Sequence, residues 1–134
     1  MFTGVNKECV PLIWPKIEPI IQRILDVDKD RYDTNDILDE ILDGILQVWI
    51  GSENDEIEVV VLTKIVPFKK KNVVFIEMLG GKNLYNWINN IDIIKQWGTE
   101  NNCESIEIIG RPGFRKILKD FNFKEKRVIY EAQL

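Results

Sequence analysis

The chain has 134 residues, 45% hydrophobic and 30% charged, which is the size and composition of one globular domain covering residues 1–134. It contains no histidine, which excludes Ser-His-Asp triads, Cys-His pairs and almost every zinc site, so we expect no metal. The net charge of −4 argues against nucleic acid as a partner, and no apolar run approaches the roughly 20 residues that a membrane span needs.

The N-terminal segment and the cysteines bear on where the protein acts. Residues Met1 to Glu8 show no basic patch followed by an apolar stretch, so we expect no signal peptide. The protein is then expected to act in the cytoplasm where it is made, or to be packaged with something else made there. Cys9 and Cys103 lie far apart and no CxxC motif is present, so both are expected to be free thiols.

The first helix is predicted after a short N-terminal strand or extended arm. That arm, residues 1–10, should end at Pro11. Apolar residues then recur at helical spacing, which predicts a helix. Because proline is tolerated only in the first turn, the regular part should start near Lys16 or Ile17, or the helix should kink at Pro19.

A second helix is predicted directly after the first. Asp33 or Thr34 can cap its N-terminus, and the acidic residues there suit the positive end of the helix dipole. Gly44 resembles a stop signal at the other end.

Three β-rich segments joined by polar turns predict an antiparallel meander. The strands are expected at 46–50, 57–68 and 73–79, with turns at 51–56 and 69–72. The second turn contains Lys69, Lys70 and Lys71. We interpret this basic cluster as a solvated hairpin tip rather than a contact with phosphate or nucleic acid.

The last part of the chain follows a strand, glycine turn, helix, strand order, which is the βαβ pattern. The glycine turn lies where a helix N-terminus could receive an anion. The predicted segments are a glycine turn at 80–83, an amphipathic helix at 84–97, a strand at 104–109, a short helix at 112–120 and a last strand at 127–132.

This order of elements is similar to the GNAT fold of the Gcn5-related N-acetyltransferases. The resemblance implies an α/β (α+β) fold with a central mixed, mostly antiparallel sheet flanked by about four helices. It maps the first strand of the family on residues 5–10, its pyrophosphate loop on Leu79 to Asn83 and its splayed parallel strand on 104–109. The pair Asn122-Phe123 looks like the Gly-Phe pair that often ends the fourth helix of the family. With Gly110 to Gly113 closing a strand, the chain also resembles small GNAT-like proteins of tailed bacteriophages.

The loop departs from the acetyl-CoA signature of the family, Gln/Arg-x-x-Gly-x-Gly/Ala. It has two adjacent glycines and no glutamine or arginine at its head, so the signature is degenerate. A purely structural strand-to-helix turn, with Asn83 as N-cap, stays open as the alternative. Arg111 could meet a phosphate or an acidic substrate, or could instead form a salt bridge or bond a helix carbonyl. By resemblance, acetyl-CoA would be bound by Leu79, Gly80, Gly81, Lys82, Asn83 and Arg111.

The resemblance also implies direct transfer of an acetyl group from the thioester to an amine. In such a reaction a carboxylate or water takes the amine proton, and a tyrosine often protonates the leaving thiolate. Glu77 shares a strand face with Val73, Phe75 and Leu79. Burial on this apolar face would raise the pKa of its carboxyl group, which suits a base. Glu77 could equally be an exposed strand-end residue. Tyr130, on the last predicted strand, is the candidate acid, although tyrosine is also a normal strand residue.

Two functions stay open. The first is a GNAT-like N-acyltransferase that moves an acetyl group from acetyl-CoA to an unidentified small-molecule or protein amine. The second is a catalytically inactive GNAT-like phage protein that serves as a binding or virion-associated structural component, with a phage or host protein as partner and the host cytoplasm as its location. The glycine turn and Glu77 favour the enzyme, while the degenerate signature and the absence of histidine favour the second. Edge strands of such a sheet could support a dimer.

Overall fold

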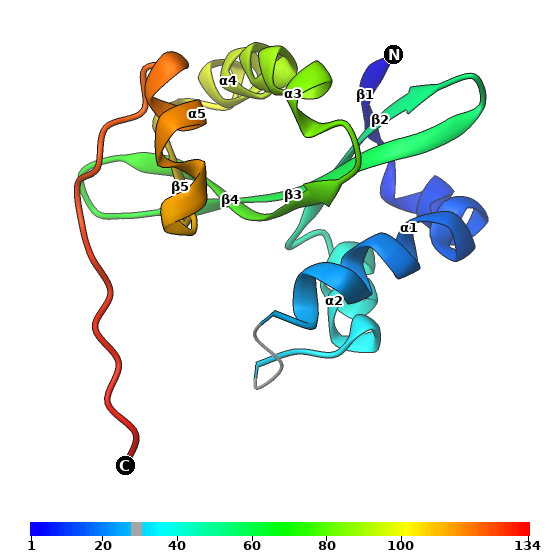
Figure 1. The fold of residues 1–134 in the computed structure, drawn as a ribbon, viewed down its shortest axis with the longest axis horizontal. Helices are drawn as coiled ribbons and strands as arrows, with labels where there is room; N and C mark the ends of the chain where they lie inside the picture. Colours follow the sequence, from blue (N-terminus) through cyan, green and yellow to red (C-terminus); the bar gives the residue numbers. More distant parts are fainter. Residues whose placement is uncertain (28–30) are drawn as a thin grey trace.

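The computed structural model describes residues 1–27 and 31–134, and within them a single sheet has the strand order β1-β2-β3-β4-β5 (Figure 1). Neighbouring strands from β1 to β4 are antiparallel, and β5 is parallel to β4, so the predicted mixed, mostly antiparallel sheet is confirmed. The elements are β1 (Phe2–Val5), η1 (Lys7–Cys9), α1 (Val10–Leu25), α2 (Thr34–Leu42), β2 (Gln47–Glu53), β3 (Glu56–Pro67), β4 (Asn72–Gly81), α3 (Leu84–Trp87), η2 (Ile88–Asn90), α4 (Ile91–Glu100), β5 (Cys103–Ile108), η3 (Pro112–Phe114) and α5 (Arg115–Asp120).

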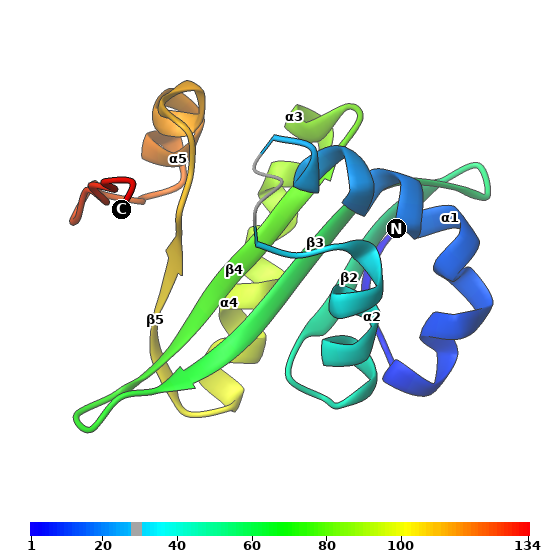
Figure 2. The same ribbon diagram turned by 90° about the horizontal axis from the view of Figure 1, so that it is seen from below.

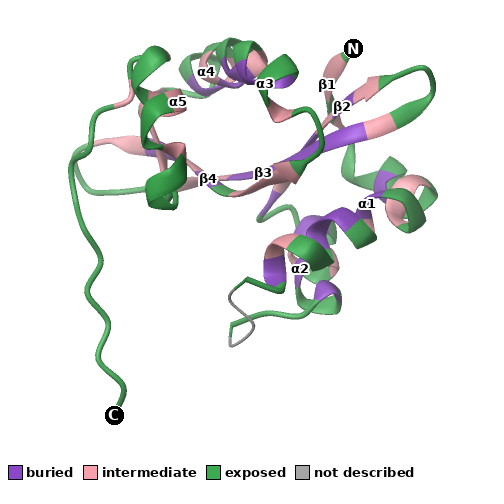
Figure 3. Cartoon of the chain, in the orientation of Figure 1, coloured by how far each residue is buried: buried purple, intermediate pink, exposed green. Residues whose placement is uncertain are grey.

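The sheet separates two layers of helices, with α1 and α2 on one face and α3 and α4 on the other (Figures 1 and 2). Side chains alternate between the faces of a strand, so each layer has its own apolar cluster. Val60 and Leu62 of β3 pack with α1 and α2, whereas Val61 between them packs with α4. The buried residues accordingly lie along the sheet and on the inner sides of the helices (Figure 3).

Helix α1 begins earlier than predicted, at Val10, and residues 7–10 are helical instead of forming part of the first strand. The predicted start near Lys16 was therefore wrong. Pro11 occupies the first turn, where its missing N–H has no consequence. Pro15 and Pro19 follow at intervals of four along the exposed side of the helix, so the carbonyls that lose a partner belong to solvent-exposed residues.

Both predicted ends of α2 are confirmed. Asp33 and Asp36 form a reciprocal capping box, in which the Asp36 backbone N–H donates to Asp33 Oδ1 at 2.9 Å and the Asp33 N–H donates to Asp36 Oδ2 at 3.0 Å. Gly44 has a φ of +79°, and the N–H of Ile45 reaches back to the carbonyl of Glu40 at 2.9 Å. This is the Schellman arrangement that satisfies the last carbonyls of a helix.

The β2–β3 turn is shorter than predicted, because the strands extend to Glu53 and from Glu56. Only Asn54 and Asp55 remain in the turn, and both have positive φ, 53° and 62°, as in the two-residue hairpins that match strand twist. Gly51 lies inside β2 and not in the turn. A Cβ there would come within 2.7 Å of the Trp87 ring, so this glycine serves packing rather than chain reversal.

The helix predicted at 84–97 is divided into α3, η2 and α4. The side-chain amide of Asn90 donates to the carbonyl of Trp87 at 3.2 Å, which gives the backbone an alternative to a continuous helix. The amphipathic character predicted for this segment is nevertheless confirmed, since Trp87, Ile88, Ile91 and Ile94 are all buried.

The predicted last strand at 127–132 was wrong, because the described part of the chain contains no strand after β5. Residues 124–134 are extended and exposed, and they leave the body of the molecule (Figure 1). Before that point Phe121 and Phe123 pack against the apolar cluster beside α4, which fixes the end of α5.

Candidate functional site

Strands β4 and β5 pair for only part of their length. Their last paired residues are Ile76 and Ile108, after which β5 ends while β4 continues to Gly81. Among the described residues, the edge of β4 that faces β5 therefore has no strand partner from Glu77 onward. Backbone N–H and C=O groups on such an edge are available to a ligand.

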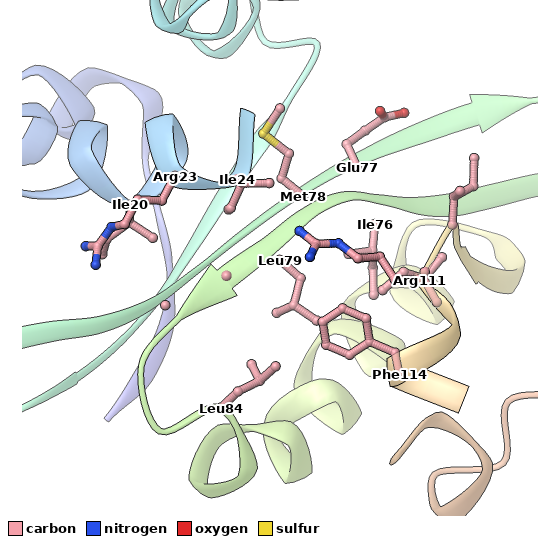
Figure 4. A pocket seen from close by; sticks show the side chains of 15 residues that line it. Ile20, Arg23, Ile24, Ile76, Glu77, Met78, Leu79, Leu84, Arg111 and Phe114 are labelled. Carbon is pink, nitrogen blue, oxygen red and sulfur yellow. The ribbon is translucent and has the colours of Figure 1, made fainter. Parts of the chain in front are cut away.

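A cavity of about 330 Å³ lies in this opening (Figure 4). Its walls come from the end of β4, the end of β5, the C-terminal part of α1, the start of α3 and the segment before α5. The apolar part is formed by side chains from each of these elements, and two arginines also line the cavity. The lining residues are Ile20, Arg23, Ile24, Ile76, Glu77, Met78, Leu79, Gly80, Gly81, Leu84, Ile108, Ile109, Gly110, Arg111 and Phe114.

A β-bulge at the edge of the cavity sets the direction of Glu77. Ile76 pairs with Thr63 and Met78 pairs with Leu62, so Glu77 is an extra residue on β4. A bulge re-aims side chains locally. Met78 consequently packs in the cluster of α1, although Leu79 returns to the opposite face.

Glu77 forms an ion pair with Lys64 of β3, with 2.9 Å between Oε1 and Nζ. The hydrogen bond to Glu77 raises the pKa of the Lys64 amine, so this lysine stays charged at neutral pH. The side chain of Glu77 is 31% exposed, so the burial on which its role as a base was predicted is absent. Its carboxylate lies on the opposite side of β4 from Leu79 and Leu84 (Figure 4).

The two glycines of the predicted loop lie inside β4, and the fold itself requires them. A Cβ on Gly80 would come within 2.6 Å of Ile24, so this glycine lets α1 approach the strand. Gly81 has a φ of +135°, and its Cβ would lie 2.0 Å from the carbonyl oxygen of Glu58 on β3. Packing therefore explains both glycines without a bound anion.

Lys82 and Asn83 form the turn after β4, and they do not line the cavity. Lys82 Nζ is paired with Glu56 Oε1 at 2.5 Å, and this hydrogen bond raises the pKa of Lys82. Asn83 is left-handed, with a φ of 56°, and its side chain makes no capping bond to α3. Instead it donates to Oε2 of the buried Glu58 at 3.1 Å, while Trp87 Nε1 donates to Oε1 at 3.0 Å.

Helix α3 is only four residues long, so its dipole adds little to anion binding. Positive charge at the cavity comes instead from arginines on other elements. The Arg111 side chain extends from the end of β5 across the cavity toward β4 (Figure 4). Among the described residues its guanidinium has no ion pair or hydrogen bond, and this leaves its donors available to a phosphate. Arg23 of α1 lines the same cavity and donates from Nε to the carbonyl of Pro19 at 3.3 Å.

The structure thus brings Glu77, Leu79, Gly80, Gly81 and Arg111 together around one cavity and leaves the other predicted residues outside it. Tyr130 lies on the C-terminal segment, is 91% exposed and does not line the cavity.

Both cysteines are free, as predicted. Burial raises the pKa of the Cys103 thiol, which keeps it protonated at neutral pH and makes it a poor nucleophile. Cys103 also packs against the cluster beside α4.

Several lining residues were missed by sequence reasoning. Ile24, Leu84 and Phe114 have the spacing and character of ordinary core residues, so no local signal separates them from the core. Arg23 sits in a helix whose other face is buried, and only the packing of α1 against β4 places it at the cavity.

Within residues 1–27 and 31–134, no three His, Cys, Asp or Glu side chains are grouped so as to hold a metal ion. The helices found in these same residues are also too short or too polar to cross a membrane.

Several solved structures of acetyltransferases are similar to this chain. A ribosomal-protein-alanine N-acetyltransferase from Brucella melitensis biovar Abortus 2308 has a TM-score of 0.74 at 9% identity, covering 100% of this chain and 99% of that chain. The aminoglycoside acetyltransferase meta-AAC0020 from an uncultured soil metagenomic sample, solved with sisomicin, has 0.72 at 13% identity over 100% and 95%. A predicted acetyltransferase from Clostridium acetobutylicum, solved with acetyl-CoA, has 0.71 at 16% identity over 99% and 95%.

These likenesses confirm the GNAT-like fold that the order of elements predicted, and at such low identities they show the fold alone. No model of a protein family and no curated protein matches the sequence.

Proposed function

We propose that this chain is a GNAT-like N-acyltransferase that binds acetyl-CoA in the opening between β4 and β5. One observation carries the proposal. The strands separate after Ile76 and Ile108, and the opening is a cavity of about 330 Å³ that is lined by apolar side chains and two arginines. This volume lies within the range of about 300–1,000 Å³ that is typical of small-molecule sites.

The residues of the cavity fit the chemistry of acetyl-CoA. The unpaired edge of β4 from Glu77 to Gly81 offers backbone groups to the amides of the pantetheine arm. Leu79, Leu84 and Phe114 offer apolar contact to the rest of that arm. The guanidinium of Arg111 has no ion pair or hydrogen bond among residues 1–27 and 31–134. It suits a phosphate, which arginine recognises with paired hydrogen bonds. When bound, acetyl-CoA supplies an acetyl group on a thioester.

We expect loss of the Arg111 guanidinium to weaken acetyl-CoA binding about tenfold, because a hydrogen bond to a charged group contributes roughly 1.5–3 kcal/mol. Isothermal titration of Arg111→Ala with acetyl-CoA and with CoA measures this change. Arg115→Ala is the matched control, since Arg115 is paired with Glu125 and does not line the cavity. Full-length protein that binds neither compound at millimolar concentration would contradict the proposed function.

Within the proposed reaction Glu77 is the candidate base for the amine proton. It lines the cavity from the bulge, and its charged partner Lys64 holds the carboxylate in place at 2.9 Å. The amine would then approach from the side of β4 that faces α1 and α2. The acceptor amine is not identified. Aminoglycosides and ribosomal-protein alanine are the first amines to try, because these acceptors appear in the names of proteins with similar folds.

If Glu77 is the base, Glu77→Gln should lower turnover by about 10²–10⁴-fold while acetyl-CoA affinity stays unchanged. Release of the CoA thiol in the presence of an accepted amine measures turnover. Glu40→Gln is the control, since this carboxylate also lies near Lys64 but belongs to α2 and is not part of the cavity wall. Unchanged turnover in Glu77→Gln would remove Glu77 from this role.

A catalytically inactive GNAT-like protein is the second candidate. The packing roles of Gly80 and Gly81 and the ion pair of Lys82 favour it, because these loop residues are engaged without any ligand. Acetyl-CoA binding without turnover on any amine would support this second function. A virion-associated role and a phage or host protein partner remain predictions from the sequence.

A further inference from the structure

A second β-bulge lies in β3, and its extra residue is Glu58. Ile57 and Val59 pair with the adjacent residues Ser52 and Gly51 of β2, and Glu58 stands between them without a partner on that strand. A bulge bends its strand and re-aims a side chain, and bulges are frequent next to functional sites. The bulge therefore decides which face of the sheet the Glu58 side chain meets.

That face is the one covered by α3. Ile57 and Val60, on either side of the bulge, both pack with α1 and α2, whereas the Glu58 carboxylate contacts Trp87 of α3. With regular alternation and no extra residue, Glu58 would share the face of Val60. Among the residues that the structure describes, Glu58 is the only charged residue that is buried, with 9% of its surface exposed. A charged group in such a place needs hydrogen-bond partners.

Both carboxylate oxygens of Glu58 bind the segment that follows β4. Trp87 Nε1 donates to Oε1 at 3.0 Å, and Asn83 Nδ2 donates to Oε2 at 3.1 Å. The backbone is joined at the same place, since the N–H of Lys82 donates to the carbonyl of Glu58 at 2.8 Å. Glu58 therefore holds the turn after β4 and helix α3 at three points.

The segment that Glu58 holds is one wall of the cavity between β4 and β5. Leu84 lies between Asn83 and Trp87 in the sequence, and its side chain lines the cavity (Figure 4). Helix α3 has four residues, and no side chain caps its N-terminus. Because so short a helix is unstable by itself, its internal hydrogen bonds cannot fix the position of Leu84. The contacts with Glu58 supply that fixation from β3.

We propose that Glu58 is a positioning residue for acetyl-CoA binding, which holds the turn after β4 and helix α3 in the conformation that receives the pantetheine arm. This inference rests on the function proposed for the cavity. A wall that is ordered before the ligand arrives loses little conformational freedom on binding, and the affinity is higher for that reason. Glu58 does not line the cavity, so it acts through Asn83 and Trp87.

Isothermal titration of the full chain with acetyl-CoA tests this role. Glu58→Ala removes both acceptors, and we expect its affinity to be about tenfold weaker. Glu58→Gln should keep an affinity near that of the unmodified chain, because its amide can accept from Trp87 and, once the Asn83 amide is turned over, donate to Asn83. Glu56→Ala is the matched control, since Glu56 of β3 pairs with Lys82 at the surface and does not line the cavity.

The indole N–H signal of Trp87 in NMR spectra gives a second readout, which reports the contact itself. Trp87→Phe identifies the signal, because phenylalanine has no N–H. We expect the signal to shift in Glu58→Ala, and to change little in Glu58→Gln and in Glu56→Ala. A general loss of stability would not produce this pattern in folded protein, and circular dichroism shows that each variant is folded.

The outcomes separate this role from the proposed function. Full acetyl-CoA affinity in folded Glu58→Ala, or an equal loss in Glu58→Gln, would overturn the role of Glu58 and leave the proposed function standing. An unmodified chain that does not bind acetyl-CoA would overturn both. If Glu58→Ala does not fold, Trp87→Phe replaces it, because this variant removes the donor to Oε1 and keeps an aromatic ring. Its affinity should then be lower, and full affinity would overturn the role.

Discussion

Replacement of Gly81 by alanine is expected to destabilise the fold by about 3 kcal/mol or more. Gly81 has a φ of +135°, a conformation that costs a residue with a Cβ about 1–3 kcal/mol. The new Cβ would also lie 2.0 Å from the carbonyl oxygen of Glu58, which is backbone and cannot turn aside. Strands β3 and β4 would have to separate next to the cavity.

Thermal and urea unfolding of Gly81→Ala measure this loss. We expect the midpoint temperature to fall by about 10 °C or more for a chain of this size. Gly113→Ala is the matched control, since nothing lies within 4 Å of a Cβ there, and it should unfold like the unmodified chain. Equal stability of the two variants would show that the close approach of Gly81 to β3 is absent.

A bulky side chain at Leu79 is expected to abolish acetyl-CoA binding, with a loss of at least about 100-fold in affinity. Leu79 points into the cavity between Leu84 and Phe114 (Figure 4). It is only partly buried, so the larger ring of Leu79→Trp can occupy the space of the cavity without displacing the core. The ring would fill the space assigned to the pantetheine arm.

The control for this experiment is Leu12→Trp. Leu12 of α1 is 82% exposed and lies outside the cavity, so the same substitution there should leave affinity unchanged. Circular dichroism of both variants separates lost binding from lost folding. Full affinity in a folded Leu79→Trp variant would place the acetyl-CoA site elsewhere.

Most of the fold could be predicted because hydrophobic periodicity and turn residues agree with the final packing. The caps of α2 at Asp33 and Gly44 are local signals, and local signals were sufficient there. The predictions that were wrong concern segments whose structure depends on contacts with residues distant in the sequence. Gly51 looks like a turn residue, and the Val59 and Trp87 side chains packed against it explain why a glycine stands inside a strand.

The C-terminal arm shows a second limit of sequence reasoning. Val128, Ile129 and Tyr130, in residues 124–134, have strand propensity, but a strand also needs a neighbour. Arg127 is ion-paired with Glu107 of β5, yet the described residues form no strand after β5. Propensity can predict what a segment is able to form. It cannot predict which edge the segment meets.

The candidate site could be predicted only in part, for a related reason. Of the β4 residues at the cavity, Glu77, Leu79, Gly80 and Gly81 were predicted by resemblance, around a recognisable glycine pair, and Met78 was not. The contributions of Ile24 and Phe114 depend on how α1 and the segment before α5 pack against β4, and no local spacing encodes that. Asn83 and Lys82 were predicted from position alone, and the structure gives them partners on β3 instead of the cavity.

The central claim is that acetyl-CoA binds where β4 and β5 separate, and backbone amide shifts in an NMR titration of the full chain test it most directly. The account predicts that added acetyl-CoA shifts the amides of residues 77–81, 109–111, 113 and 114, which line or adjoin the cavity. The amides of the hairpin tip at 69–71, on the far end of β4, should stay unchanged. The absence of shifts at millimolar acetyl-CoA, or shifts confined to residues outside the cavity, would contradict it.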